Sequence, residues 1–211
     1  MNSMPPVEGK ETTMEELQDY SGPLMRGLKS RESLDVFSKD AIVRMIAGAS
    51  KLYLGSEGGF YTVVRKRFGE QLANEMDREV LLDRAAPQIV SRLRNAFDIR
   101  GDDVASFLKF LQIEPLLAIN IAEFELKDED RGLVTVHRCR ALEYWERHGE
   151  NGLQKNACGI HASGLRQAAC SFNPHMSVRA LTLPPRHITM GNPGRNKPPI
   201  ACQWEVAMSE Q

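Results

Sequence analysis

Apolar residues recur every three or four positions through the first half of the chain, and this spacing predicts helices. The first helix begins at Ser38, a good N-cap residue, and its apolar positions continue to Tyr53. Glycines crowd the next segment, residues 55–59, and predict a turn or a close backbone approach. We therefore expect a second, separate helix over residues 60–68.

A longer helical pattern covers residues 71–97. Pro87 is expected to divide or kink it, because proline lacks the amide hydrogen that the helix needs. An aspartate pair at 102–103 offers an N-cap for another helix over residues 104–111. Pro115 closes this helical half of the chain.

The second half changes to short apolar runs typical of strands. Two such runs, 117–126 and 133–136, flank a charged turn and predict a β-hairpin. Two helices and then two strands follow, over residues 140–147, 157–171, 177–183 and 200–206. Gly149 ends the first of these helices, and Asn156 is expected to cap the second.

These elements predict an α+β fold. An N-terminal helical half would pack on a C-terminal antiparallel sheet of about four strands with two helices. We expect a flexible N-terminal arm over residues 1–37 and one α+β domain over 38–211. Within that domain, residues 38–115 form the helical part and 116–211 the sheet-containing part. The loop over 184–199 is long enough either to cover a pocket or to be a simple surface loop.

Composition narrows the functional classes. The 211 residues carry a net charge of -1, without the basic excess typical of nucleic-acid binders. No apolar stretch is long enough to span a bilayer and no signal-peptide core is present, so we expect a cytoplasmic protein with neither nucleic-acid nor membrane partners. The mixed-charge run over 77–84 predicts a solvated surface.

Candidate chemistry gathers late in the chain, at Cys139, Cys158, His161 and Cys202. Cys139 and Cys158 are expected at helix N-termini, where the helix dipole favours thiolate over thiol. Cys202 is expected to share a face of the last strand with Trp204, two residues on. Three thiolates and an imidazole form a ligand set for zinc, and three thiolates also hold iron–sulfur clusters. Spacing alone leaves open the alternative that these cysteines are structural fillers of a core.

Two further residues border this set. His137 lies two residues before Cys139 and is a candidate fifth contributor, with a half-buried structural histidine as the alternative. Cys170 falls on a different face of its expected helix from Cys158, and we expect it in the core.

The C-terminal motifs resemble those of a known family. They are Cys139-Arg140-Ala141-Leu142-Glu143, Gly149, Cys158-Gly159-Ile160-His161, Phe172-Asn173-Pro174 and Cys202-Gln203-Trp204. They resemble the L-2-amino-thiazoline-4-carboxylic acid hydrolase-like family and a related group of small, uncharacterised bacterial and archaeal proteins. That resemblance implies hydrolytic opening of a thiazoline ring. The chain differs from the family pattern at His161, where the family has an acid.

Three functions remain open from the sequence. The first is an enzyme that acts on a small heterocyclic or carboxylated substrate, with Cys158 as nucleophile or metal ligand and His161 as proton carrier. The second is a sensor or carrier module that holds zinc or an iron–sulfur cluster on the same cysteines. The third is an interaction protein whose helices over 38–113 pack against a partner or against a second copy of the chain.

Overall fold

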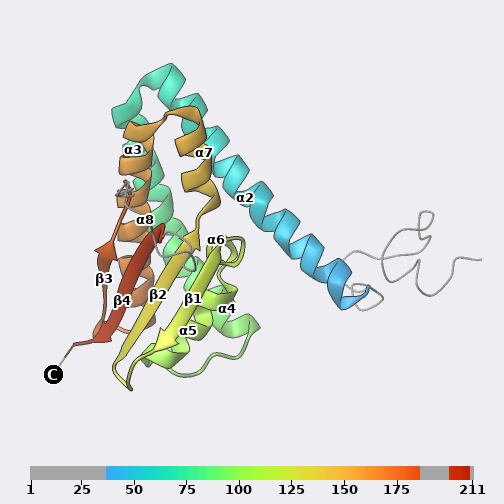
Figure 1. Ribbon diagram of the computed structural model, residues 1–211, viewed down its shortest axis with the longest axis vertical. Coiled ribbons are helices and arrows are strands. Elements are labelled where there is room, and N and C mark those ends of the chain that lie inside the picture. Colours follow the sequence, from blue (N-terminus) through green and yellow to red (C-terminus); the bar gives the residue numbers. More distant parts are fainter. Residues whose placement is uncertain (1–36, 186–199, 210–211) are drawn as a thin grey trace, which may run out of the picture. The chain divides into compact units, whose positions relative to one another are not determined.

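A computed structural model describes residues 37–185 and 200–209 of the chain (Figure 1). The predicted N-terminal arm, except for its last residue, and most of the 184–199 loop lie outside the described residues. Internal contacts divide the chain into two units, residues 1–49 and 50–211. The described part of the first unit begins helix α2 (Lys39–Phe68), and the amide of Ala41 donates to Ser38 Oγ at 3.1 Å. The predicted N-cap at Ser38 is therefore confirmed.

The helix α2 corrects one prediction. It runs for 30 residues without a turn at Gly55, Gly58 or Gly59, so the predicted separate helix over 60–68 is wrong. A glycine inside a helix costs about 1 kcal/mol relative to alanine, which is too little to break a helix that has good helix formers on both sides. The helix ends before Gly69, whose φ of 93° lies in the region that favours glycine.

The predicted division near Pro87 is confirmed. The chain passes through α3 (Glu70–Arg78), a π-helix (Glu79–Ala85) and α4 (Ala86–Ala96). Pro87 stands in the first turn of α4, directly after the π-helix. Two further helices, α5 (Val104–Ile113) and α6 (Pro115–Ala118), complete this half. Asp103 caps α5 by accepting a bond from the amide of Ser106 at 2.7 Å.

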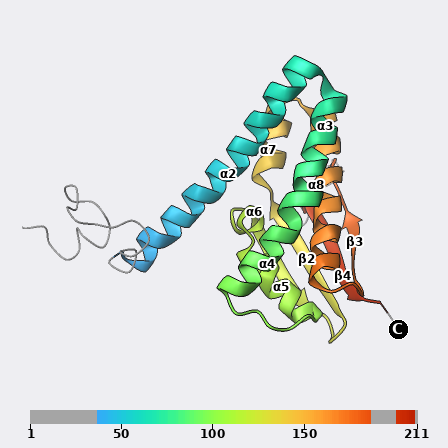
Figure 2. The ribbon, with the colours of Figure 1, turned by 180° about the vertical axis from the view of Figure 1, so that it is seen from behind.

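The fold is α+β, with a helical N-terminal half followed by a four-stranded antiparallel sheet, as predicted. The strands are β1 (Ile121–Leu126), β2 (Arg131–Arg138), β3 (Met176–Thr182) and β4 (Cys202–Met208). They lie in the order β1-β2-β4-β3, so the last strand pairs between the second and third. Seen from behind, α4, α5 and α8 (Asn151–Phe172) cover one face of this sheet (Figure 2).

The main core lies between that face and the helices. Its apolar side chains come from α4, α5, α8 and the strands; they include Val90, Val104, Phe107, Phe110, Leu111, Val134, Ala169, Phe172, Val178, Trp204 and Val206. Phe107 and Phe172 meet edge to face, with ring centroids 5.3 Å apart. The guanidinium of Arg94 lies 4.2 Å above the Phe172 ring and donates to the carbonyl of the same residue at 3.3 Å. These contacts fix the end of α8 against α4 and α5, and α8 carries two of the predicted site residues.

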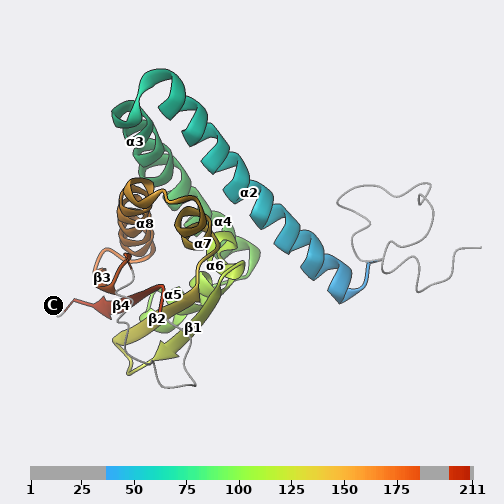
Figure 3. The same cartoon turned by 45° about the horizontal axis from the view of Figure 1, so that its top comes forward.

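The helices α7 (Arg140–His148) and α8 lie side by side above the sheet (Figure 3). Gly149, with φ of 69°, ends α7 as predicted. The next prediction is wrong: α8 begins at Asn151, so Asn156 lies inside it and is no N-cap. The Asn156 side chain instead donates to Glu70 Oε1 at 2.7 Å, which satisfies it without a helix end. None of the helices in the described ranges combines the length and the apolar character that a membrane crossing needs.

Candidate functional site

The helix α8 carries Cys158 and His161 three residues apart, so both side chains project from one side of it. Because α8 begins at Asn151, Cys158 lies two turns inside the helix. The expectation that a helix N-terminus activates Cys158 is therefore wrong, since the dipole acts only within the first turn.

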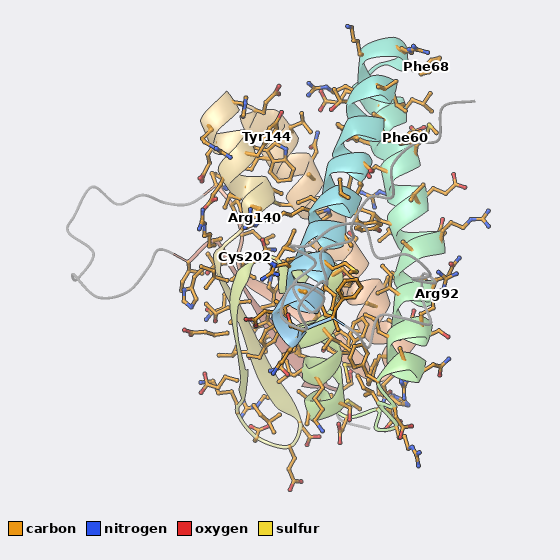
Figure 4. The ribbon with its side chains drawn as sticks, turned by 90° about the vertical axis from the view of Figure 1, so that its right-hand side faces the viewer. Phe60, Phe68, Arg92, Arg140, Tyr144 and Cys202 are labelled. Atoms are coloured by element: carbon orange, nitrogen blue, oxygen red, sulfur yellow. The ribbon has the colours of Figure 1, made fainter. Side chains whose placement is uncertain are left out.

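The other two predicted cysteines lie at the end of the sheet nearest α7. Cys139 is the residue before α7, and Cys202 is the first residue of β4. Both pack against the same buried cluster, formed by Val136, Leu142 and Ala201. The indole of Trp204 donates to Cys202 Sγ at 3.3 Å, which confirms that these two side chains share a face. Arg140 and Tyr144 on α7 follow Cys202 upward along one side of the molecule in Figure 4.

Burial keeps the thiols of Cys158 and Cys202 protonated, contrary to the thiolate expected at Cys158. Burial raises the pKa of Cys158 to about 12, and the neighbouring Cys139 and Cys202 add to the effect. Burial also raises the pKa of Cys202 to about 11, although the hydrogen bond from Trp204 works against it. The three predicted cysteines are thus close enough to influence one another, and Cys158 and Cys202 are neutral groups in a poorly solvated region.

The described residues lend no support to the predicted metal site. Within residues 37–185 and 200–209, no three side chains of histidine, cysteine, aspartate or glutamate come together in a way that would hold an ion. The predicted ligand set of Cys139, Cys158, His161 and Cys202 is therefore without support and stays a prediction. The same holds for the sensor or carrier function that depends on it.

Two cavities meet at His161. The inner cavity, about 200 Å³, lies between the sheet and the helices that cover it. Its wall is mostly apolar and includes Leu81, Phe110, Leu111, Val134, Leu165 and Trp204; its polar members are Tyr53, Glu114, Asn120, Cys139, His161 and Cys202. The outer cavity, about 630 Å³, lies among α2, α7 and α8, with Asp77 contributed by α3. Its wall includes Lys51, Glu57, Tyr61, Arg65, Asp77, Arg140, Tyr144, Trp145, Arg147, Glu150 and His161.

Among the residues that the structure describes, His161 alone lines both cavities. Its side chain lies deep in the fold yet keeps 37% of its surface accessible, because it faces these two hollows. Its Nε2 lies 3.9 Å from Glu57 Oε1, within range of an ion pair and too far for a hydrogen bond. Cys158, by contrast, does not line either of these cavities.

Three carboxylates surround this imidazole. Burial alone would lower the pKa of His161, but Glu57, Asp77 and Glu114 together raise it above its ordinary value. The imidazolium is therefore stabilised at neutral pH. Burial, followed by the charge of Glu57, raises the pKa of Asp77, while His161 lowers it.

Glu114 also has a structural role, as the cap of a helix. Its Oε2 accepts the amide of Leu117 at 2.8 Å and so caps the short helix α6. Burial raises its pKa even though that bond, like the nearby His161, works in the opposite direction. Glu114 is thus a carboxyl group of the inner cavity with a fixed orientation.

Sequence reasoning missed these carboxylates. The run over 77–84 was expected to be a solvated surface, but Asp77 is half-buried beside the outer cavity. Glu57 stands between glycines, and Gly55, Gly58 and Gly59 line the same cavity. Three glycines around one glutamate on a helix leave open space beside that glutamate. This pattern in the sequence could have indicated a cavity next to Glu57.

The structure also bears on the predictions for two other residues, Cys170 and His137. Cys170 is exposed, so its expected place in the core is wrong; it lies on the side of α8 that faces away from the sheet core. His137 is half-buried on β2, and its Nε2 lies 3.1 Å from Glu123 Oε2 on the neighbouring strand. Its role as a fifth contributor to the cysteine site stays a prediction.

Comparison with known proteins adds no relative. No protein-family model matches the chain, and neither a curated protein nor a solved structure matches it. The resemblance to the thiazoline-carboxylate hydrolase-like family therefore stays a prediction. Function has to be inferred from the two cavities and the groups that meet at His161.

Proposed function

We propose that the chain is an enzyme that hydrolyses a small heterocyclic or carboxylated molecule held against His161. The observation that carries this proposal is the position of His161 on the wall shared by the two cavities. An apolar hollow with a few convergent polar groups and shifted pKa values is the usual form of an enzyme site. The resemblance in the C-terminal motifs favours the same class of reaction.

The titratable groups divide naturally into an acid and a base. His161 has a raised pKa, so its imidazolium is available to donate a proton. Asp77 lines the same cavity, and its raised pKa makes it a better proton acceptor than an ordinary aspartate. Neighbouring groups with opposite tasks are typical of hydrolytic sites.

The proposed reaction uses water as the nucleophile. Asp77 takes a proton from water as the water oxygen bonds to the ring carbon of the substrate, and the π electrons of the carbon–nitrogen double bond go to nitrogen, which takes the proton from His161. The remaining carbon–nitrogen bond then breaks, its electron pair goes to nitrogen, and that nitrogen takes the proton held by Asp77. The hydroxyl proton returns to His161 as the carbonyl forms, so both groups regain their starting protonation states. The predicted role of Cys158 as nucleophile is not part of this scheme, because its pKa of about 12 keeps it a thiol. Cys139 and Cys202 contribute weakly polar side chains to the wall of the inner cavity.

The test is hydrolysis of a panel of small ring compounds, with 2-amino-thiazoline-4-carboxylate among them, by the full chain. Loss of a general acid costs about 10²–10⁴ in rate, and we expect this loss in His161→Gln. The matched control is His148→Gln, since His148 is exposed on α7 and its ring nitrogen contacts the carbonyl of Tyr144 at 2.7 Å. Equal turnover by wild type and His161→Gln, or no turnover of any compound, would contradict the proposal.

A further inference from the structure

The groups around His161 are unbalanced in charge. Glu57 comes from α2, Asp77 from α3 and Glu114 from the start of α6, and each influences the imidazole electrostatically. Three carboxylates against one imidazolium leave an excess of two negative charges when all four groups are ionised. Tyr53 adds a phenol that burial and these same acids keep neutral, because they raise its pKa.

Glu57 is the least satisfied of these groups. Only 18% of its side chain is exposed, and its Oε2 has no contact with solvent and no hydrogen-bond partner within the described residues. Among the residues that the structure describes, the partner of its other oxygen is His161, whose Nε2 lies 3.9 Å away. A buried carboxylate normally accepts several hydrogen bonds, so Glu57 lacks donors. Because the terminal torsion of glutamate is broad, a small rotation brings either oxygen to the outer cavity.

The three arginines of the outer cavity are engaged elsewhere, and its lysine, Lys51, is exposed on α2. Arg65 pairs with Glu150 at 3.5 Å. The Nε atoms of Arg140 and Arg147 donate to backbone carbonyls at 3.1 Å, and both side chains lie exposed along α7. The outer cavity thus has a basic, solvated side and an acidic, poorly solvated side next to His161.

The cavity wall also suits an organic cation. Tyr61 and Trp145 line it, and aromatic faces attract cations through their negative quadrupole. Bare metal ions require at least three donors in a tight shell, and the described residues contain no such group. An ammonium group satisfies the acids differently, since each N–H supplies a hydrogen bond together with positive charge.

We infer that the outer cavity binds a protonated amine, with its ammonium group between Glu57 and Asp77 and beside His161. The inference rests on the proposed function, because it names the charge of the molecule on which His161 would act. It excludes a ligand that presents only an anion to this side of the cavity.

Binding of two probes of matched size tests the inference. Benzylammonium and benzyl alcohol are titrated separately into the full chain by calorimetry at neutral pH. We expect benzylammonium to bind at least tenfold more tightly than the alcohol. We expect Glu57→Gln and Asp77→Asn each to lower its affinity at least tenfold. The control is Glu75→Gln, which removes an exposed carboxylate of α3 that does not line the cavity and accepts a hydrogen bond from Gln71 Nε2 at 3.0 Å, and we expect its affinity to stay within twofold of wild type.

A His161→Gln variant separates this inference from the proposed function. Removing the imidazolium removes a like charge, so it should tighten benzylammonium binding severalfold while it abolishes turnover. If binding follows this pattern but no compound is turned over, the result contradicts the proposed function and supports the amine site. Equal binding of alcohol and amine, no binding of benzylammonium, or wild-type affinity in both Glu57→Gln and Asp77→Asn would overturn the inference. So would an equal loss in Glu75→Gln, with folding of every variant checked by circular dichroism.

Discussion

Treatment of the native protein with iodoacetamide tests whether burial or activation governs the cysteines. At pH 7 a pKa of about 12 leaves roughly 10⁻⁵ of Cys158 as thiolate, and a pKa of about 11 leaves roughly 10⁻⁴ of Cys202. An ordinary cysteine, with a pKa near 8.5, is about 3% thiolate at the same pH. Only the thiolate reacts, so the population alone predicts Cys158 to react about 3,000-fold more slowly.

Intrinsic reactivity offsets part of that difference. A thiolate becomes more nucleophilic as its pKa rises, with a Brønsted coefficient of about 0.4–0.5. Between a pKa near 8.5 and one of about 12, this makes the Cys158 thiolate roughly 40-fold more reactive than an ordinary thiolate. The net expectation for Cys158 is therefore alkylation about a hundredfold slower than that of an ordinary cysteine. Restricted access through the packed wall slows it further.

The assay is a time course of peptide mapping by mass spectrometry. Cys170 is exposed and provides an internal reference within the same helix. We expect Cys170 to be modified first and Cys158 to stay unmodified until the protein is unfolded, when all four thiols should react at similar rates. Modification of native Cys158 at the Cys170 rate would refute the reasoning and would favour the activated nucleophile expected from the sequence.

Three further predictions concern stability, each measured by urea denaturation. Gly58→Ala should raise the free energy of unfolding by about 1 kcal/mol, because an added Cβ inside α2 meets nothing within 4 Å; destabilisation would contradict this. Leu142→Ala should lower it by about 2–5 kcal/mol, because Leu142 is fully buried; a change below about 1 kcal/mol would show that the cluster is loose. Glu114→Gln keeps the cap on α6 and removes a buried charge. Since burial raises the pKa of Glu114, its ionised form destabilises the fold above the ordinary glutamate pKa, so this variant should be more stable at pH 7 and equal to wild type near pH 3. The opposite order at pH 7 would contradict that sign.

Local signals predicted several helix ends, but the strand expected from residue 117 begins at Ile121, and Pro115 opens α6 where it was expected to close the helical half. Ser38, Asp103 and Gly149 each act through backbone groups a few residues away, so the sequence around them contains the whole interaction. The glycines of α2 and Asn156 were misinterpreted because the rest of the fold outweighs a local preference of about 1 kcal/mol. Asn156, for example, bonds to Glu70, which lies far away in the sequence.

The residues of the candidate site show the same difference between what local sequence predicts and what tertiary packing decides. His161 was predicted from the reactivity of its side chain, and the cysteines were predicted to be neighbours. Whether those cysteines are thiolates depends on burial, which the spacing of residues does not contain. The carboxylates of Glu57 and Asp77 were missed because two helices bring them to His161 through tertiary packing. Scattered charged residues carry no sign of such a meeting point.

The most direct measurement of the central claim is the titration of His161 by NMR in wild type and in Glu57→Gln. We expect the wild-type imidazole to titrate above the ordinary histidine value, because its carboxylate neighbours outweigh its burial. Removing the Glu57 charge should then lower the His161 pKa. A wild-type imidazole that titrates below the ordinary value, or one that ignores Glu57→Gln, would mean that His161 is simply a buried histidine without the charge that proton transfer requires.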